Sequence, residues 1–329
     1  MNRRGLLLGA AALAACGDAA SGPAPAFPMR RAINLGNALE APNEGEWGYR
    51  IAPSDLAAIA QAGFDGVRLP VRWDAHAETT GPYIISPGFF DRIDQVIAWA
   101  FESGLKVQVD CHHYEALIAA PERERERFVS IWRQIGEYFS GAPDALLFEP
   151  LNEPNGERWR GETLTSVQAE VVAAIRETNA TRLIVLGPGD WNAISALMRW
   201  TPPEASNIAV SVHYYEPHDF THQNAEWLGD AAPQYAGSWG STADLQRVAA
   251  HARRAADWAA RNGMALQLGE FGVNAAAPLA QRAAWTRSVR LAFESMGAGW
   301  CVWDFAGAFP LWDSAEQRFI PEMLDALGL

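Results

Sequence analysis

Cysteine and lysine are scarce in this chain of 329 residues. Of its three cysteines, Cys111 and Cys301 lie far apart in apolar, strand-like runs. So few cysteines, placed so far apart, favour buried free thiols over a disulfide bridge. Lys106 is the only lysine among 26 basic residues, and 39 acidic residues give a net charge of −13. Such an acidic surface argues against nucleic acid and anionic lipid as partners.

Long apolar runs are also missing, except for a short one near the N-terminus. Two arginines precede an apolar run from Leu6 to Ala15, which is too short to span a bilayer and is typical of an export signal. The end of this run, with Cys16, resembles the lipobox of bacterial lipoproteins. We therefore predict a signal peptide over residues 1–15, a lipid on Cys16, a flexible tether over residues 16–29 and a place at the bacterial cell envelope, in the periplasm or at the outer membrane. Simple secretion is the alternative, and Sec and twin-arginine export both stay open.

The rest of the chain contains no linker, charge block or internal repeat, which indicates one domain over residues 30–329. Apolar runs alternate in it with amphipathic, helix-like segments, a pattern typical of buried parallel strands. We predict eight strands, at residues 32–35, 66–69, 106–110, 146–149, 183–186, 208–212, 265–268 and 300–303. Eight repeats indicate a closed (β/α)8 barrel, an α/β fold of the TIM-barrel type. A doubly wound open sheet is the alternative, but its usual glycine-rich turn after the first strand is missing.

Polar residues stand where most of the predicted strands end. In a (β/α)8 barrel these ends converge on one open face, which is where chemistry takes place. A single polar strand end is often only a satisfied structural group, but a whole rim of them is hard to explain by solvation. The rim residues are Asn37, Glu40, Arg68, His112, His113, Asn152, Glu153, His213, Tyr215, Glu270 and Trp303.

Glu153 and Glu270 follow the fourth and seventh strands and should face each other across the barrel mouth. Such a pair can divide into a proton donor with a raised pKa and an ionised nucleophile, as in glycosidic cleavage. Carboxyl groups about 5 to 5.5 Å apart indicate retention, whereas about 6.5 to 9.5 Å leaves room for the water of an inverting enzyme. The barrel mouth favours the shorter distance, so we assign Glu153 as acid/base and Glu270 as nucleophile.

The other rim residues fit roles around this pair. Arg68 and Tyr215 would hold Glu270 in its anionic form. Asn152 is placed to bind a sugar 2-hydroxyl, and Asn37 and Glu40 are assigned to substrate binding as well. The histidines can orient hydroxyls and tune the glutamates. They are His112, His113 and His213.

Tryptophan is abundant, with 14 residues against 7 tyrosines. Its flat apolar face and polar edge suit sugar rings, so Trp303 would form a floor for stacking and Trp227 would also bind substrate. One loop tryptophan alone is more often simple packing, but as a group they fit an extended polymer cleft. Those in predicted loops are Trp47, Trp73, Trp159, Trp191, Trp227, Trp239 and Trp312.

Seven blocks of the sequence resemble glycoside hydrolase family 5, the cellulase family of (β/α)8 retaining enzymes. They are INLGNALEAPNEGEWG, GFDGVRLPVRW, VQVDCHHYE, LLFEPLNEP, VSVHYYEPHDFTHQ, QLGEFG and WCVWDFAGAFPLWD, in family order from residue 33 to 313. The resemblance implies Glu153 as proton donor and Glu270 as nucleophile. Around the cleaved bond it implies Arg68, His112, Asn152, His213, Tyr215 and Trp303. Two blocks look most like the endoglucanase branch, which implies a retaining endo-β-1,4-glucanase acting on β-glucan. The proposed mechanism requires no cofactor, and because the sequence offers no basis for an oligomer we expect a monomer.

Three alternatives stay open. A β-mannanase, glucomannanase or mixed-linkage glucanase of the same family would differ only in loop contacts that one sequence does not reveal. A metal-dependent hydrolase would need histidines that share one ion, and His112 and His113 would point to opposite sides of a continuing strand, so we predict no metal. A non-catalytic sugar-binding lipoprotein could keep the fold, although both glutamates are present.

Overall fold

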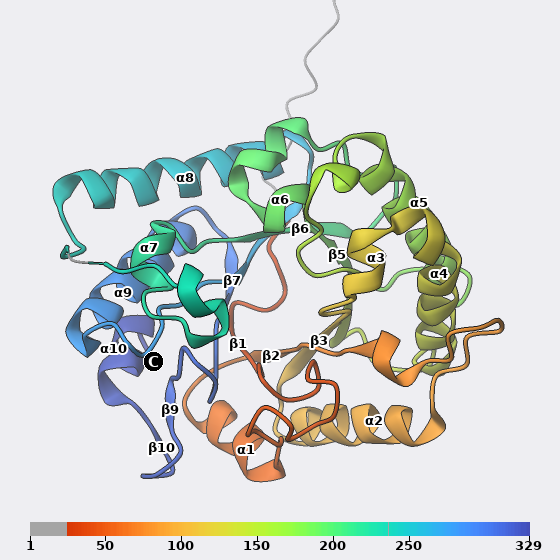
Figure 1. Cartoon of the computed structure of the whole chain (residues 1–329), viewed down its shortest axis with the longest axis horizontal. Helices are drawn as coiled ribbons and strands as arrows, with labels where there is room; N and C mark the ends of the chain where they lie inside the picture. Colours follow the sequence, from red (N-terminus) through yellow and green to blue (C-terminus); the bar gives the residue numbers. More distant parts are fainter. Residues whose placement is uncertain (1–24, 236) are drawn as a thin grey trace, which may run out of the picture.

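Eight parallel strands form a closed barrel (Figure 1). The computed structural model describes residues 25–235 and 237–329. The strands follow one another in chain order around the barrel, and the last pairs with the first. They are β1 (Arg31–Asn34), β2 (Gly66–Leu69), β3 (Lys106–Asp110), β4 (Leu146–Glu149), β5 (Ile184–Leu186), β6 (Ile208–His213), β7 (Ala265–Glu270) and β8 (Gly299–Val302). The predicted (β/α)8 TIM barrel is therefore confirmed.

Helices cover the outside of this barrel (Figure 1). The main ones are α1 (Pro53–Gln61), α2 (Pro87–Glu102), α4 (Pro121–Tyr138), α5 (Glu162–Arg176), α8 (Thr242–Arg261), α9 (Leu279–Ser295) and α10 (Pro321–Leu327). Between β5 and β6 the chain forms only α6 (Gly189–Asn192) and the 3-10 helix η3 (Ile194–Arg199). The other short elements are η1 (Trp73–His76), α3 (Glu115–Ala119), η2 (Glu157–Trp159), α7 (His218–Thr221), η4 (Glu226–Ala231) and the hairpin of β9 (Trp312–Asp313) and β10 (Arg318–Phe319). Among the described helices, none has the length and apolar character to cross a membrane.

Apolar side chains of the strands pack on both sides of the barrel wall. Side chains alternate along a strand, so Leu146 and Phe148 pack in the layer between strands and helices, while Leu147 lies inside the barrel. This double burial explains why the strands appear in the sequence as continuous apolar runs. Cys111 and Cys301 are buried and free, as predicted. The interior cluster contains Ala32, Leu147, Val185, Ala209, Ala265 and Cys301.

Phe27 and Met29 close the N-terminal end of the barrel. Both are buried and pack on the interior cluster. Gly299 makes room for them, because a Cβ at this position would lie 2.2 Å from the carbonyl oxygen of Met29. The packed domain therefore begins earlier than expected, inside the predicted tether of residues 16–29. The rest of that tether and the whole predicted signal peptide, with Cys16, lie outside the described residues.

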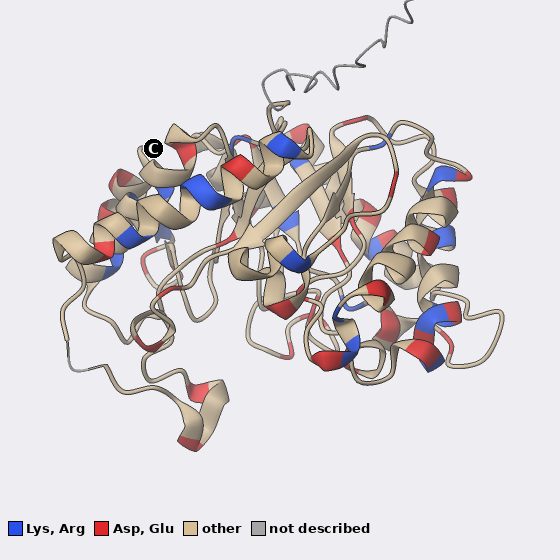
Figure 2. Cartoon of the chain, turned by 90° about the horizontal axis from the view of Figure 1, so that it is seen from above, with Lys and Arg blue, Asp and Glu red and all other residues tan. Residues whose placement is uncertain are grey.

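Charged residues of both signs lie mainly on the outer helices and loops (Figure 2). A few lie inside the barrel instead. Arg68, Asp110 and Glu149 have no exposed surface at all, and Glu270 is almost fully buried. Burying charges in this way is costly unless they are paired. These residues therefore indicate where in the barrel a functional site lies.

Candidate active site

A cleft of about 910 Å³ opens at the C-terminal ends of the strands. Arg68 and Asn152 lie buried just beneath it, where they bond to each other. Glu40 does not line the cleft. The other residues that the sequence assigned to the site do, namely Asn37, His112, His113, Glu153, His213, Tyr215, Trp227, Glu270 and Trp303.

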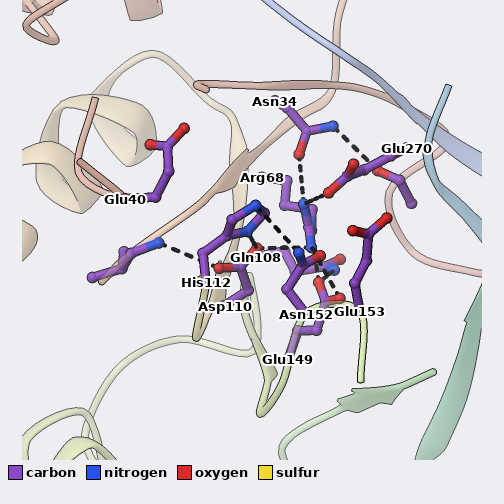
Figure 3. Close-up of polar contacts among 12 residues, drawn as sticks. Asn34, Glu40, Arg68, Gln108, Asp110, His112, Glu149, Asn152, Glu153 and Glu270 are labelled. Atoms are coloured by element: carbon purple, nitrogen blue, oxygen red, sulfur yellow. Dashed lines mark hydrogen bonds and ion pairs between the residues drawn. The ribbon is translucent and has the colours of Figure 1, made fainter. Parts of the chain in front are cut away.

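Arg68 is the centre of the polar layer beneath the cleft (Figure 3). Its Nε and Nη2 donate to the two oxygens of Glu149 at 2.6 and 3.0 Å, and its Nη1 donates to Glu270 Oε1 at 2.7 Å. Nη2 also lies 2.7 Å from Asp110 Oδ2. Burial works to lower the pKa of Arg68, but the three carboxylates raise it well above its usual value, so the guanidinium stays charged. Glu149, an otherwise costly group in an apolar strand, is thus compensated by a bidentate ion pair.

Hydrogen-bond directions around Asn152 follow from its contact with Arg68. Because a guanidinium has only donors, Asn152 must present its amide oxygen to Nη2, at 2.7 Å. Its Nδ2 then donates to His112 Nε2 at 3.2 Å, and His112 Nδ1 donates to Asp110 Oδ2 at 3.0 Å. Burial, reinforced by the charge of Arg68, lowers the pKa of His112 well below its usual value. The neutral ring and the amide are therefore each held in one orientation.

The two predicted catalytic glutamates meet in the cleft. Carboxylate oxygens of Glu153 and Glu270 and a ring nitrogen of His213 all lie within 4.8 Å of one another. His213 Nδ1 is 2.8 Å from Glu153 Oε1 and 3.6 Å from Glu270 Oε2. This spacing fits the shorter of the two carboxyl separations known for glycosidases. In the described part of the chain, these three residues are also the one group whose donor atoms could hold a metal ion.

Local backbone features aim these side chains at one another. A register shift between Val212 and His213 sets His213 opposite Glu270 on the neighbouring strand. Glu153 has a φ of 47°, in the left-handed region that residues with side chains seldom adopt. Asn155 Nδ2 donates to the carbonyl oxygen of Glu153 at 2.9 Å, which helps to hold that turn.

Burial raises the pKa of both glutamates to about 7, but their contacts differ. Glu270 accepts from Arg68 and, at 3.0 Å, from the hydroxyl of Tyr215, which both stabilise its anion. Among the described residues, the carboxyl group of Glu153 has only His213 as a hydrogen-bond partner, and burial lowers the pKa of that ring, which disfavours its cationic form. A proton shared by the pair therefore resides on Glu153. The site holds one protonated and one ionised carboxyl group side by side.

Comparison with known families agrees with this geometry. The family model described as "Cellulase (glycosyl hydrolase family 5)" matches residues 33–308. The chain belongs to glycosyl hydrolase family 5. Within this family it is similar to Endoglucanase H of Acetivibrio thermocellus, at 33% identity over 306 residues that cover 91% of this chain and 33% of that protein. The chain thus spans about a third of the length of this curated relative.

Solved structures of the family superpose closely on the barrel. Two of them are Cel5A of Thermotoga maritima, one in complex with cellobiose and one with mannotriose. Each is 37% identical to this chain with a TM-score of 0.88, and the match covers 91% of this chain and 97% of Cel5A.

Glu40 lies behind a loop of this family 5 site, although the sequence assigned it to substrate binding. Its Oε2 accepts from the backbone N–H of Ala38 at 2.9 Å, and its other oxygen accepts from that of Asn37. Burial raises the pKa of Glu40 to about 8. The side chain therefore supports the turn at Asn37, where φ is 64°, and Asn37 in turn lines the cleft.

The seven loop tryptophans differ in how far they are exposed. Three have between 42% and 56% of their surface exposed and line the cleft: Trp47, Trp191 and Trp227. Trp312 is partly buried against the hydrophobic core. The remaining three are buried, in line with the simple packing expected of a single loop tryptophan: Trp73, Trp159 and Trp239. Two of these satisfy their indole N–H inside the protein, Trp73 on the carbonyl of Asp110 and Trp159 on that of Ile118, both at 2.9 Å. An aromatic residue in a loop is therefore no guide by itself to the side it faces.

Sequence reasoning missed the polar layer inside the barrel. Gln108 Nε2 donates to Glu149 Oε2 at 2.6 Å, and the amides of Gln108 and Gln267 bond to each other at 2.8 and 3.1 Å. The signal was present in the stretch VQVD, where Gln108 and Asp110 alternate with valines. Polar residues at every second position of a buried strand mark the face that points into the barrel.

Proposed function

We propose that the protein is a retaining endo-β-1,4-glucanase, which hydrolyses β-glucan chains without a cofactor. The observation that carries this is the pair formed by Glu153 and Glu270, whose oxygens lie within 4.8 Å at the base of the cleft. Arg68 and Tyr215 each donate a hydrogen bond to Glu270, whereas the Glu153 carboxyl group is bonded to His213. Double displacement needs this asymmetry between a proton donor and a nucleophile.

The first chemical step transfers the sugar to the enzyme. The Glu270 carboxylate attacks the anomeric carbon and forms a C–O bond, while the bond from that carbon to the leaving oxygen breaks. The proton of Glu153 moves to the leaving oxygen, so the departing sugar chain carries a neutral hydroxyl. Arg68 and Tyr215 hold the attacking carboxylate in place.

The second step returns the enzyme to its starting state. Water attacks the same anomeric carbon, Glu153 accepts a proton from this water, and Glu270 leaves as a carboxylate. Two successive inversions at one carbon retain its configuration. Glu153 therefore acts as an acid in one step and as a base in the next.

Relatives support a glucan substrate and leave a second candidate. The name of Endoglucanase H and the cellobiose complex of Cel5A support β-1,4-glucan cleavage. The mannotriose complex of Cel5A favours, as the second candidate, a β-mannanase or glucomannanase activity at the same site. The same two carboxyl groups would serve both reactions.

Parallel assays separate these candidates. We expect reducing-sugar release from barley β-glucan and carboxymethylcellulose to exceed that from mannan, and proton NMR to show a product of retained anomeric configuration. Inversion of configuration would contradict the mechanism, and faster cleavage of mannan would favour the second candidate. Glu270→Gln should abolish hydrolysis while sugar binding, followed by calorimetry, persists. A purely sugar-binding protein would bind in the same way but show no turnover in the wild type.

We further propose that the protein is exported and held at the cell envelope by a lipid on Cys16, and that it is a monomer. The support is the short apolar run that ends at Cys16. The full chain should partition with detergent and yield a lipidated N-terminal peptide by mass spectrometry, and Cys16→Ser should remove both signals. An unlipidated, secreted wild type would indicate simple cleavage instead. Light scattering of the purified protein tests the monomer.

A further inference from the structure

Asn192 contacts the catalytic machinery from behind and has no part in the two steps above. Its side chain has no exposed surface, and its Nδ2 is 3.3 Å from His213 Nε2. The other nitrogen of that ring, Nδ1, is 2.8 Å from Glu153 Oε1. The imidazole of His213 therefore links Asn192 to the predicted acid/base.

The hydrogen bonds from Asn192 through His213 to Glu153 have one consistent assignment of donors and acceptors. His213 Nδ1 lies 2.8 Å from Glu153 Oε1 and 3.6 Å from Glu270 Oε2. The ionised Glu270 can only accept, and a protonated Glu153 still accepts on the oxygen that carries no proton, so an Nδ1–H suits both carboxyl groups. Nε2 must then accept, which requires the Nδ2 of Asn192 to face it. The atom left over is Asn192 Oδ1, which has no hydrogen-bond partner among the described residues. The reverse amide orientation would leave a buried N–H unpaired, which is the rarer situation in proteins.

Asn192 is held in this position by a left-handed turn. Asp190, Trp191 and Asn192 have φ values of 55°, 59° and 54°. Residues with side chains seldom adopt this conformation, so three in succession need support from their surroundings. Arg199 Nη2 donates to the Asp190 carboxylate at 2.6 Å. At Gly187, a Cβ would lie 2.1 Å from Asn192 Oδ1, so only glycine leaves space for the amide.

We propose that Asn192 is a positioning residue that fixes the tautomer of His213 and so directs an Nδ1–H donor at Glu153. This rests on the proposed function, in which Glu153 is the acid/base. Without the donor from Asn192, the proton can move to Nε2, and the lone pair of Nδ1 then faces Glu153. That arrangement favours a protonated Glu153 over its carboxylate. The second chemical step requires the carboxylate, so it becomes slower.

Asn192→Gly is the informative substitution, because glycine removes the amide and tolerates a φ of 54°. Asn207→Gly is a matched control. Asn207 is also an asparagine with positive φ, at 55°, and it lies just before β6, whereas His213 ends that strand. Asn192→Asp is a second variant of nearly unchanged shape, and its carboxylate can accept from Nε2–H but cannot donate to it.

Long-range proton–nitrogen NMR of the histidine rings reads the tautomer directly. We expect the proton of His213 on Nδ1 in the wild type and in Asn207→Gly, and a protonated Nε2 in Asn192→Gly and Asn192→Asp. A wild-type ring protonated on Nε2, or an unchanged tautomer in both Asn192 variants, would overturn the proposal. This readout does not depend on turnover, so it stays informative even if the wild type hydrolyses no glucan and the proposed function fails.

Kinetics on barley β-glucan give the second readout. For Asn192→Gly we expect kcat to fall roughly 10-fold with KM changed less than about 2-fold, because only part of the general acid–base contribution depends on this hydrogen bond. The basic limb of the pH profile of kcat/KM should move to higher pH. Asn207→Gly should leave both unchanged. A rise in KM with an unshifted pH profile would assign Asn192 to substrate binding and contradict the positioning role.

Discussion

Among the residues of the site, Arg68 contacts the most buried carboxyl groups. It is fully buried and contacts Asp110, Glu149 and Glu270 within 2.7 Å. Three carboxyl groups so close together in a buried place would repel one another without a cation among them. The arginine therefore makes the negative charge of the site compatible with folding.

Replacing Arg68 should destabilise the whole protein. Arg68→Met leaves the surrounding carboxylates buried and unpaired, so we expect a loss of about 3–5 kcal/mol in the free energy of unfolding by urea. Arg133→Met is the control, because Arg133 pairs with Glu177 on the surface, where water screens the pair and its loss should change the unfolding free energy little. Equal losses in the two variants would show that the buried network does not hold the fold.

The two glutamates should respond differently to the leaving group of the substrate. Glu153→Gln removes the proton donor, so we expect a roughly 10²–10⁴-fold loss of kcat on β-glucan. On an aryl cellobioside whose phenol leaves without protonation, the release of the phenol should be slowed far less. Glu270→Gln should lose both activities, because the nucleophile is needed for every substrate. A similar loss on both substrates in Glu153→Gln would contradict its role as acid.

The sequence identifies the catalytic glutamates but not the residues with which each side chain forms hydrogen bonds. Glu153 and Glu270 could be found because each follows an apolar strand, and strand ends converge in a barrel. Asn192 could not, because it follows the left-handed Asp190 and Trp191, and a single sequence shows neither backbone handedness nor the ring behind which the amide lies. The prediction that Glu40 binds substrate was wrong because its carboxyl group accepts from backbone N–H groups, and a sequence does not show such contacts.

Elements of the barrel were more predictable than single side chains. Strands buried on both faces leave long apolar runs, which is why the predicted and observed strands agree within one or two residues. The segment between β5 and β6 is the exception, since it forms only short helical pieces there. The N-terminal closure was also missed, because Phe27 and Met29 stand among residues with the composition of a linker.

This closure should contribute to stability. Phe27→Ala removes a buried ring at the end of the barrel and leaves a cavity, so we expect a loss of about 3–5 kcal/mol in unfolding free energy. Ile84→Ala serves as the control, because 46% of Ile84 is exposed and such a change costs within about 0.5 kcal/mol. Stability unchanged in Phe27→Ala would show that the barrel does not need this residue.

The whole molecule should be more stable in mild acid than in mild base. Burial raises the pKa of several carboxyl groups: Asp110 to about 6, Glu153 and Asp304 to about 7, and Glu40 to about 8. A carboxyl group with a raised folded-state pKa binds more protons folded than unfolded, so its stabilising contribution is full below its unfolded pKa and is lost as the pH rises through the folded pKa. The net charge of −13 adds repulsion in the same direction. The melting temperature should therefore fall between pH 5 and about pH 8, and a rise over this range would refute the prediction.

Glu40→Gln separates one part of this pH dependence from the rest. The amide cannot ionise, so the melting temperature of the variant should fall less steeply toward pH 8 than that of the wild type. Asp219→Asn, an exposed carboxyl group, should leave the slope unchanged. An unaltered slope in Glu40→Gln would show that Glu40 does not titrate in this range.

The closed end of the barrel also determines where an N-terminal attachment lies relative to the cleft. Phe27 lies at the N-terminal end of the barrel, whereas Glu153 and Glu270 line the cleft at the opposite end. A group attached to the chain before Phe27 is therefore joined to the domain at the N-terminal end of the barrel. If the proposed lipid on Cys16 anchors the chain, the attachment lies at the end of the barrel opposite the cleft and leaves the cleft unobstructed for polymer.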